Sequence, residues 1–110
     1  MTMLISTDEA KWQEHPVEAG VKTKPFAQFP EYRLRLRINL IARKGLDEHS
    51  HPHGYIFYLL HGRGKMWVED VGNLELSVST FIVIPPDLRH RVFDVIEPIE
   101  LLSIGIVAAK

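Results

Sequence analysis

The feature that most constrains the fold of this chain is a strict two-residue alternation in its first half. From Arg33 the sequence reads Arg-Leu-Arg-Leu-Arg-Ile-Asn-Leu, so that Leu34, Leu36, Ile38 and Leu40 occupy every second position. Side chains two residues apart point to the same face of a β-strand, whereas a helix would distribute these four residues around its axis. The pattern therefore predicts an amphipathic β-strand.

The remainder of the chain continues as a series of short strand-like runs. Residues suited to turns separate these runs, as in Gly62-Arg63-Gly64 and Pro85-Pro86-Asp87, and every connection is brief. Short strands at this spacing favour antiparallel pairing in a sandwich or barrel, so we expect an all-β fold. The runs rich in β-branched and aromatic residues are Tyr55–Leu60, Lys65–Glu69, Asn73–Ser77, Thr80–Ile84, Arg91–Val95 and Ile99–Val107.

Size and composition indicate a single domain without thiol chemistry. The 110 residues include 45% hydrophobic and 25% charged residues, which is typical of a globular domain with one core. Cysteine is absent, so disulfides and thiolate ligands are excluded. Any bound metal must therefore be held by nitrogen and oxygen ligands.

Charge and hydropathy argue against nucleic-acid and membrane partners. The formal net charge is −1, and no cluster of lysine and arginine is present to neutralise phosphates. The longest mostly apolar stretches, Tyr55–Leu60 and Leu101–Ala109, are far shorter than the roughly 20 residues that a membrane-spanning helix requires. The first residues lack a positive flank followed by an apolar run, so we expect a cytoplasmic protein.

The first thirty residues differ from the rest, and we expect residues 1–30 to form an arm and residues 31–110 to form the barrel. One helical turn is predicted around Thr7 to Gln13, capped by Ser6 or Thr7. Prolines interrupt any longer element, at Pro16, Pro25 and Pro30. Three aromatic residues of the arm need burial, on the outside of the barrel or against a second subunit: Trp12, Phe26 and Phe29.

Histidines are crowded immediately before a strongly apolar run. His49, His51 and His53 lie within five residues of one another. Two histidines at positions i and i+2 of an extended chain project from one face, so both imidazoles could approach one ion at about 2.1 Å. A third ligand must come from elsewhere, and His90 is the best candidate because it opens a predicted strand after a proline turn.

Two motifs in the region from about Leu36 to Val107 resemble those of the cupin family. The first family motif has the form HxH, three or four residues, Glu, six residues, Gly. Here His49-Ser50-His51 is followed after three residues by Tyr55 and after six more by Gly62. The spacing to Gly62 selects the pair His49 and His51, which leaves His53 outside the ligand set.

The second family motif reads Gly, five residues, Pro-x-Gly, two residues, His, three residues, Asn. In this chain the proline and the histidine are retained, while both glycines and the asparagine are replaced; the matching positions are Ser79, Pro85, Asp87, His90 and Asp94. The resemblance implies a double-stranded β-helix barrel, usually a homodimer. It also implies a metal ion inside the wider mouth, held by His49, His51 and His90.

Tyr55 is the most important departure from the family pattern, because most metal-binding cupins have a glutamate ligand at this position. Three neutral imidazoles would leave the full 2+ charge on the ion and about three coordination positions for water, dioxygen or an anionic substrate. Such a site is similar to the three-histidine iron centres of cupin-type dioxygenases that act on β-diketones or thiols. Alternatively, the Tyr55 phenol binds the ion or donates to a metal-bound group, or the ring simply fills the barrel interior.

The remaining histidines receive structural interpretations. His53, between Pro52 and Gly54, is expected in a loop. His61 precedes a glycine turn and is expected to be solvated, and His15 precedes Pro16 in the arm.

The charged residues near the predicted barrel remain without a functional role. Arg33, Arg35 and Arg37 share the face opposite the leucines, and we expect that face to be solvated on an edge strand. An interior placement would instead offer guanidinium forks to a carboxylate or phosphate substrate. Asp94 and Glu69 could serve as a general base, but their spacing requires neither.

These observations predict a metal-dependent enzyme that acts on a small oxygenated or thiol-bearing molecule. Dioxygenase chemistry with Fe(II) is favoured, and zinc, nickel or manganese could support non-redox isomerase, lyase, decarboxylase or cyclase chemistry instead. Two non-catalytic alternatives stay open, a ligand-binding or sensor module that reports through a dimer, and a structural barrel with an empty site. Apart from a small molecule, the expected partner is a second copy of the chain.

Overall fold

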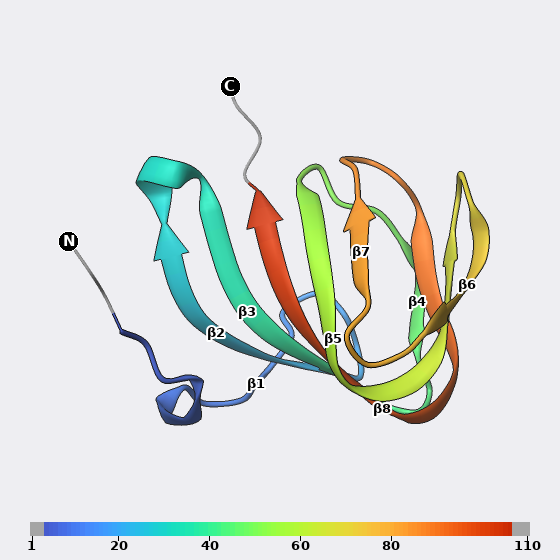
Figure 1. The fold of residues 1–110 in the computed structure, drawn as a ribbon, viewed down its shortest axis with the longest axis horizontal. Coiled ribbons are helices and arrows are strands. Elements are labelled where there is room, and N and C mark those ends of the chain that lie inside the picture. Colours follow the sequence, from blue (N-terminus) through green and yellow to red (C-terminus); the bar gives the residue numbers. More distant parts are fainter. Residues whose placement is uncertain (1–3, 107–110) are drawn as a thin grey trace.

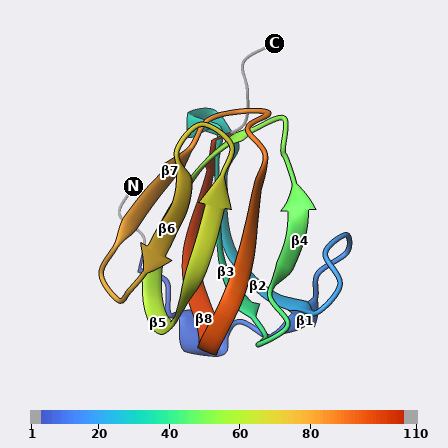
Figure 2. The ribbon, with the colours of Figure 1, turned by 90° about the vertical axis from the view of Figure 1, so that its right-hand side faces the viewer.

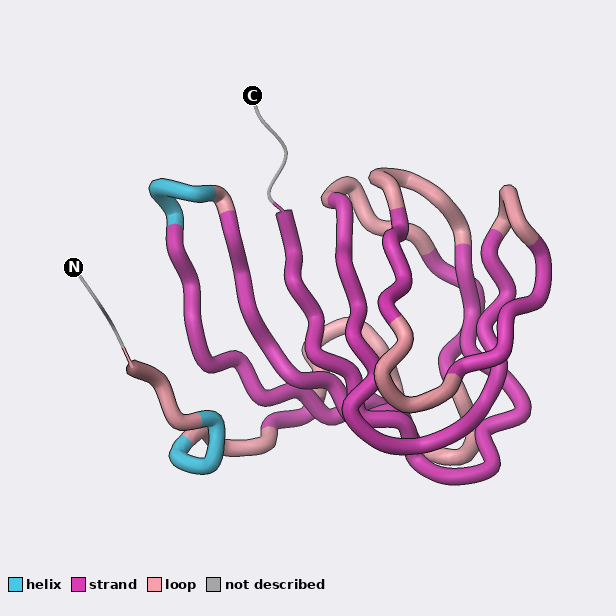
Figure 3. The backbone as a smooth tube through the Cα atoms, in the orientation of Figure 1, coloured by secondary structure: helices cyan, strands magenta, loops and turns pink. Residues whose placement is uncertain are grey.

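The computed structural model describes residues 4–106, which form a β-barrel with two short 3-10 turns (Figure 1). Strands account for most of the backbone in this range (Figure 3). The prediction of an all-β antiparallel barrel is confirmed. The elements are η1 (Thr7–Glu9), β1 (Gln13–Glu14), β2 (Val21–Phe29), η2 (Pro30–Tyr32), β3 (Leu34–Ile41), β4 (Leu46–His49), β5 (Gly54–Val68), β6 (Gly72–Leu76), β7 (Phe81–Ile84) and β8 (His90–Ile106).

The barrel is built around two long strands, β5 and β8, that run through both of its walls (Figures 1 and 2). The second half of β8 pairs with β3 and with the first half of β5, as in Ile41↔Ile99 and Tyr55↔Gly105. The first half of β8 pairs with β4 and with the second half of β5. Strands β7 and β6 extend the two walls from opposite halves of β5.

Each long strand combines two of the runs that the sequence suggested as separate strands. The runs at 55–60 and 65–69 are joined in β5, and those at 91–95 and 99–107 are joined in β8; Val107 itself lies outside the described residues. Gly62 permits the join, because its φ of 103° is accessible to glycine and a Cβ there would collide with the carbonyl of Pro98. Register shifts between Leu59 and Lys65 bend the strand instead of ending it.

The segment expected as an arm is divided between loop and sheet. Residues 21–29 form β2, which pairs along the whole length of β3, and the helical turn is limited to Thr7–Glu9. β1 pairs only with Lys22 and Thr23, so β2 is an edge strand at Pro25. Edge strands tolerate proline, which has no backbone N–H to donate to a neighbouring strand. Trp12 is 39% exposed, with the Lys24 ammonium 4.7 Å from its ring centre.

The core lies between the two walls and is closed by residues that alternate along β5 and β8. Leu59 and Ile99 are completely buried, and Met66, Ile84 and Leu101 are nearly so. Met66 and Leu101 also line the open space inside the barrel, which reaches β4 and the start of β8. In the part of the chain that the structure describes, no helix has the length and hydropathy to cross a membrane.

Candidate metal centre

His49 and His90 face each other across neighbouring antiparallel strands. His49 is the last residue of β4, and the register pairs it directly with His90, the first residue of β8. The centroids of the two rings lie 4.3 Å apart. The sequence separates these residues by forty positions, so strand pairing is what joins the two motifs.

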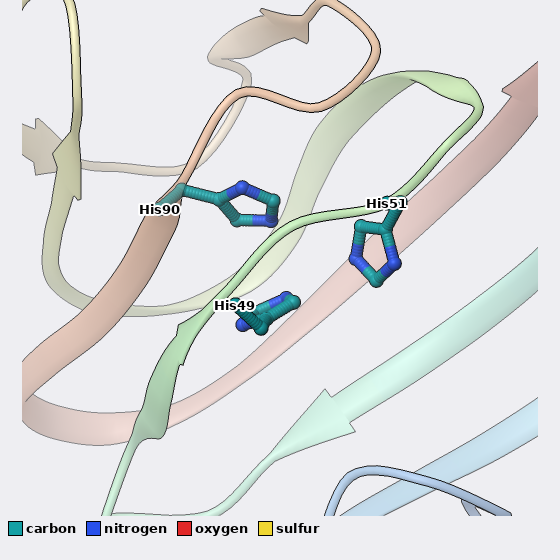
Figure 4. Close-up of side chains that lie close together, drawn as sticks. All are labelled: His49, His51 and His90. Atoms are coloured by element: carbon teal, nitrogen blue, oxygen red, sulfur yellow. The ribbon is translucent and has the colours of Figure 1, made fainter.

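His51 completes the cluster from the loop after β4. Its carbonyl accepts a hydrogen bond of 2.7 Å from the N–H of Asp87, which belongs to the proline turn before β8. The His51 ring centre is 4.7 Å from that of His49 and 5.4 Å from that of His90. Figure 4 shows the three rings converging from the end of β4, the following loop and the start of β8.

Backbone hydrogen bonds fix which nitrogen two of these rings present. His49 Nδ1 lies 2.7 Å from the carbonyl oxygen of Asp47, and His90 Nδ1 lies 2.9 Å from that of Leu88. A carbonyl can only accept, so the proton of each neutral ring belongs on Nδ1. The Nε2 lone pairs are therefore free to bind an ion, and the same hydrogen bonds hold the rings in orientation.

The donor set fits a divalent metal ion. One potential ligand atom from each histidine lies within 4.8 Å of the other two. Three nitrogens bound to one ion at about 2.1 Å lie about 3.0–3.4 Å apart in octahedral or tetrahedral geometry, so side-chain movements on the order of 1 Å would bring all three into coordination distance. The residues that sequence spacing selected are thus brought together, and they could hold a metal.

Burial keeps the imidazoles in the form that binds metals. Desolvation, followed by the charges of His49 and His90, lowers the pKa of His51 from 6.5 to about 4. Burial also lowers the pKa of His90, which is only 2% exposed, although its bond to the Leu88 carbonyl opposes the shift. Both rings are therefore neutral near pH 7, and the three-histidine group contains no carboxylate.

Tyr55 lies beside the cluster. It is the second residue of β5, and its ring centre is 4.9 Å from that of His51 and stacks at 5.5 Å on Phe57. Gly105, directly opposite on β8, provides the room, because a Cβ there would lie 3.0 Å from the tyrosine ring. The Tyr55 hydroxyl makes no hydrogen bond within residues 4–106 and is available to a ligand.

The histidines and Tyr55 line a cavity with a volume of about 50 Å³. Apolar side chains such as Phe57 and Met66 form much of its wall. Polar groups that the sequence did not assign to a site also reach it, namely His15, Glu18, Arg37 and Asn39.

The loop between β1 and β2 carries two of these additional residues to the cavity. His15 Nδ1 accepts the backbone N–H groups of Val17 at 3.2 Å and Glu18 at 3.0 Å. Burial is the main cause that lowers the pKa of His15, and the nearby charge of Arg37 lowers it further while Glu18 raises it. The segment expected as an arm thus contributes to the candidate site. Its sequence, which is interrupted by prolines, contains no pattern that would have predicted this contribution.

The arginine face of β3 is divided in a way that the sequence did not predict. Arg37 is half-buried and lines the cavity, which contradicts the expectation of a solvated face, whereas Arg33 and Arg35 are exposed. Alternation correctly placed the arginines opposite Leu36 and Ile38, but it carries no information about which face turns inward. Curvature of the barrel decides that point.

The two carboxylates considered as general bases lie outside the cavity. Asp94 is exposed, 3.8 Å from the Lys65 ammonium. The Glu69 carboxylate accepts hydrogen bonds from the backbone N–H of Arg89 at 3.1 Å and from the Arg89 guanidinium at 3.2 Å, and these bonds lower the pKa of Glu69. Arg89 also reaches Glu48 at 3.4 Å, so it links the segments that carry His49 and His90 on the solvent side.

The other histidines are not part of the group. His61 has a side chain that is 77% exposed and lies 3.9 Å from Glu100. His53 does not line the cavity. The sequence-based separation of His53 from the pair His49 and His51 therefore agrees with the geometry.

Comparison with solved structures identifies the fold as that of a small cupin domain. A cupin 2 conserved barrel domain protein from Rhodopseudomonas palustris superimposes with a TM-score of 0.73 at 14% identity, covering 96% of this chain and 74% of the other. KdgF from Halomonas sp. reaches 0.76 at 22% identity, covering 98% and 96%. The polyketide cyclase RemF from Streptomyces resistomycificus reaches 0.76 at 17% identity, covering 96% and 79%.

Sequence comparisons add no closer relative. No family model matches the chain, and no curated protein matches it. Structural neighbours with this fold also include a DMSP lyase, a predicted oxalate decarboxylase and an Fe(II)-containing HppE. At such low identity these neighbours establish the fold, and their diverse names agree with the general observation that one fold supports many reactions.

Proposed function

We propose that this chain is a metal-dependent enzyme whose centre consists of His49, His51 and His90. The observation that carries the proposal is the convergence of three imidazoles inside a cavity, with two of them oriented by backbone carbonyls. A divalent ion bound there would supply Lewis acidity and, if it is iron, redox chemistry toward dioxygen. No carboxylate belongs to the group, so the ion would keep its full charge for an incoming ligand.

The chain's own residues prepare the cavity for a small oxygenated substrate. The three histidines hold the ion, and the carbonyls of Asp47 and Leu88 maintain two of the rings in place. Phe57 and Met66 keep water from the inner wall. Tyr55 lines the same space and its hydroxyl makes no hydrogen bond within residues 4–106, so we assign it the role of donating a hydrogen bond to the substrate.

Dioxygenase chemistry is the reaction class that we propose first, since a neutral three-histidine set leaves several adjacent coordination positions open. The test uses tag-free protein, analysed for metal and then loaded anaerobically with Fe(II). Oxygen uptake with a β-diketone or thiol substrate, lost in His49→Ala and retained in His61→Ala, would support it. Protein that binds neither iron nor zinc would overturn the enzyme proposal.

Non-redox chemistry is the second candidate, because a polyketide cyclase and a DMSP lyase are among the structural neighbours. A Lewis acid can stabilise an enolate without electron transfer, and zinc would suffice. Turnover by the zinc form under nitrogen would favour this candidate. Turnover that requires both iron and dioxygen would reject it.

A further inference from the structure

We propose that the ligand of this cavity is a small carboxylic acid and that Arg37 binds its carboxylate. The inference rests on the proposed metal site and adds the chemical class of the substrate. Two observations carry it: the placement of Arg37 without a partner and the charge balance of the cavity.

Arg37 is a cation directed at the same space as the metal-binding histidines. It is half-buried on β3 and lines the cavity together with His49, His51 and His90. Within residues 4–106 it has no ion-pair partner inside 4.0 Å and makes no hydrogen bond. A partly desolvated guanidinium without a counter-ion has a strong tendency to bind an anion, and its planar fork matches a carboxylate.

The wall around Arg37 shows a second unsatisfied group. Asn39, two residues along the same strand, donates from Nδ2 to Ser103 Oγ at 3.0 Å, while its buried Oδ1 has no partner among the described atoms. Buried acceptors are rarely left unpaired in folded proteins. Asn39 Oδ1 is an acceptor, so only a donor such as a hydroxyl could satisfy it, and it does not contribute to binding the carboxylate itself.

A β-bulge lies on the neighbouring strand at the same level. The register of β2 shifts between Pro25 and Ala27, and Pro25 is the residue opposite Arg37. Bulges of this kind re-aim side chains and are common beside active sites. The irregularity therefore lies on the strand beside the cavity-lining Arg37.

The charge balance favours an anionic ligand. The charged residues that line the cavity are Arg37 and Glu18, whose formal charges cancel, and an imidazole that binds a metal ion is neutral. A bound divalent ion would therefore leave two positive charges without compensation. A ligand that places one oxygen near the histidines and its carboxylate on Arg37 reduces that excess.

A carboxylate fits better than a phosphate. A phosphate group usually recruits several donors, whereas Arg37 is the single arginine or lysine in the lining. The cavity volume of about 50 Å³ also favours a compact acid.

The test measures binding instead of turnover, using calorimetric titration of malonate into the zinc-loaded protein. Arg37→Met should weaken malonate binding by at least about 10-fold, the lower range for hydrogen bonds to charged groups, with the zinc stoichiometry unchanged. Arg37→Lys should give an intermediate affinity, because it keeps the charge and loses the fork. Glu18→Gln should bind malonate more tightly than the native chain does.

Arg35→Met provides the matched control, since Arg35 lies two residues away on the same strand but is exposed and does not line the cavity. Its malonate affinity should equal that of the native protein.

Equal affinities for Arg37→Met and the native chain, both with zinc bound, would overturn the inference and leave the metal site intact. Inorganic phosphate that binds more tightly than malonate and depends equally on Arg37 would overturn the carboxylate assignment. Native protein that retains no zinc would overturn the proposed function and this inference together.

Discussion

The inner and outer surfaces of one wall of the barrel, formed by β3, β8 and β5, have opposite characters. The inner surface near the cavity carries Arg37, Asn39 and Tyr55. The outer surface is apolar, because the residues between these positions form two rows across the strands: Leu102, Tyr58 and Phe81 beside the buried Ile38 in one, and Leu36, Ile104, Ile56 and Val83 in the other. The comparison shows that strand alternation in a barrel with a functional interior does not always direct its apolar face to the core.

The two surfaces also differ in what remains unsatisfied. Inside, polar groups such as the Arg37 guanidinium and Asn39 Oδ1 have no partners among the residues described. Outside, Phe81 and Val83 are 65% and 67% exposed. We infer that the inner surface is completed by an ion and an anionic ligand, and that the outer surface is completed by another protein surface.

The largest effect is expected on the inner surface, from His90→Ala. Loss of a partner that merely orients a metal ligand already costs 10- to 100-fold in affinity, so loss of a ligand should lower zinc affinity by at least about 100-fold. Competition with a chromophoric chelator would measure this. His61→Ala is the matched control, because the His61 side chain is 77% exposed and is not part of the three-histidine group.

Circular dichroism would report whether the chain still folds without the buried His90. If it does not, the zinc affinity of His49→Ala provides the same test. His49 is only half-buried, so its removal should leave the barrel intact. Native-like zinc affinity in either folded variant would contradict the assignment of the centre.

The next effect concerns the outer surface, where we propose that two copies of the chain form a homodimer. Val83→Glu would place a charge in the apolar rows, and burial of an unpaired carboxylate should raise the dimer dissociation constant by at least about 10-fold. Sedimentation at several concentrations would measure it. Val71→Glu, a substitution at a similarly exposed valine in the turn after β5, should have no effect. A native chain that remains monomeric at every concentration would exclude the dimer.

The smallest effect belongs to neither surface and concerns the backbone. Ser79, at a position where the cupin motif has glycine, has a φ of 72°. Left-handed conformations cost a non-glycine residue about 1–2 kcal/mol, so Ser79→Gly should raise the free energy of unfolding by about 0.5–1 kcal/mol after the entropy of glycine is included. Urea denaturation of the metal-free protein would show the difference.

Ser50→Gly is the control for that substitution. Ser50 is also an exposed loop serine, but its φ is not positive, so glycine there should be neutral or destabilising. If Ser79→Gly were equally destabilising, the strain at this turn would be refuted.

Much of the fold and of the candidate centre followed from local sequence patterns. Alternation predicted β3, and the i, i+2 spacing of His49 and His51 predicted their shared side, since both depend only on the geometry of an extended chain. His90 followed from its spacing to Pro85 in the second motif. These features are short-range, so the sequence alone was sufficient.

Other features depend on which strands pair, and local patterns do not specify that. The arm was expected as far as residue 30, yet residues 21–29 pair with β3 because that strand had an open edge. His15 and Glu18 reach the cavity because the pairing of β1 with β2 brings the loop that carries them to it. Contacts of this kind join segments whose relation is set by the whole barrel.

The sequence by itself determined an all-β chain, the three histidines and the substitution of Tyr55 for an acidic ligand. The tertiary structure decided that Arg37 and Asn39 face inward while Leu36 and Ile38 face outward. The physical reason is that a strand's two faces are distinguished by alternation, but the inside of a barrel is defined only when distant strands close around it.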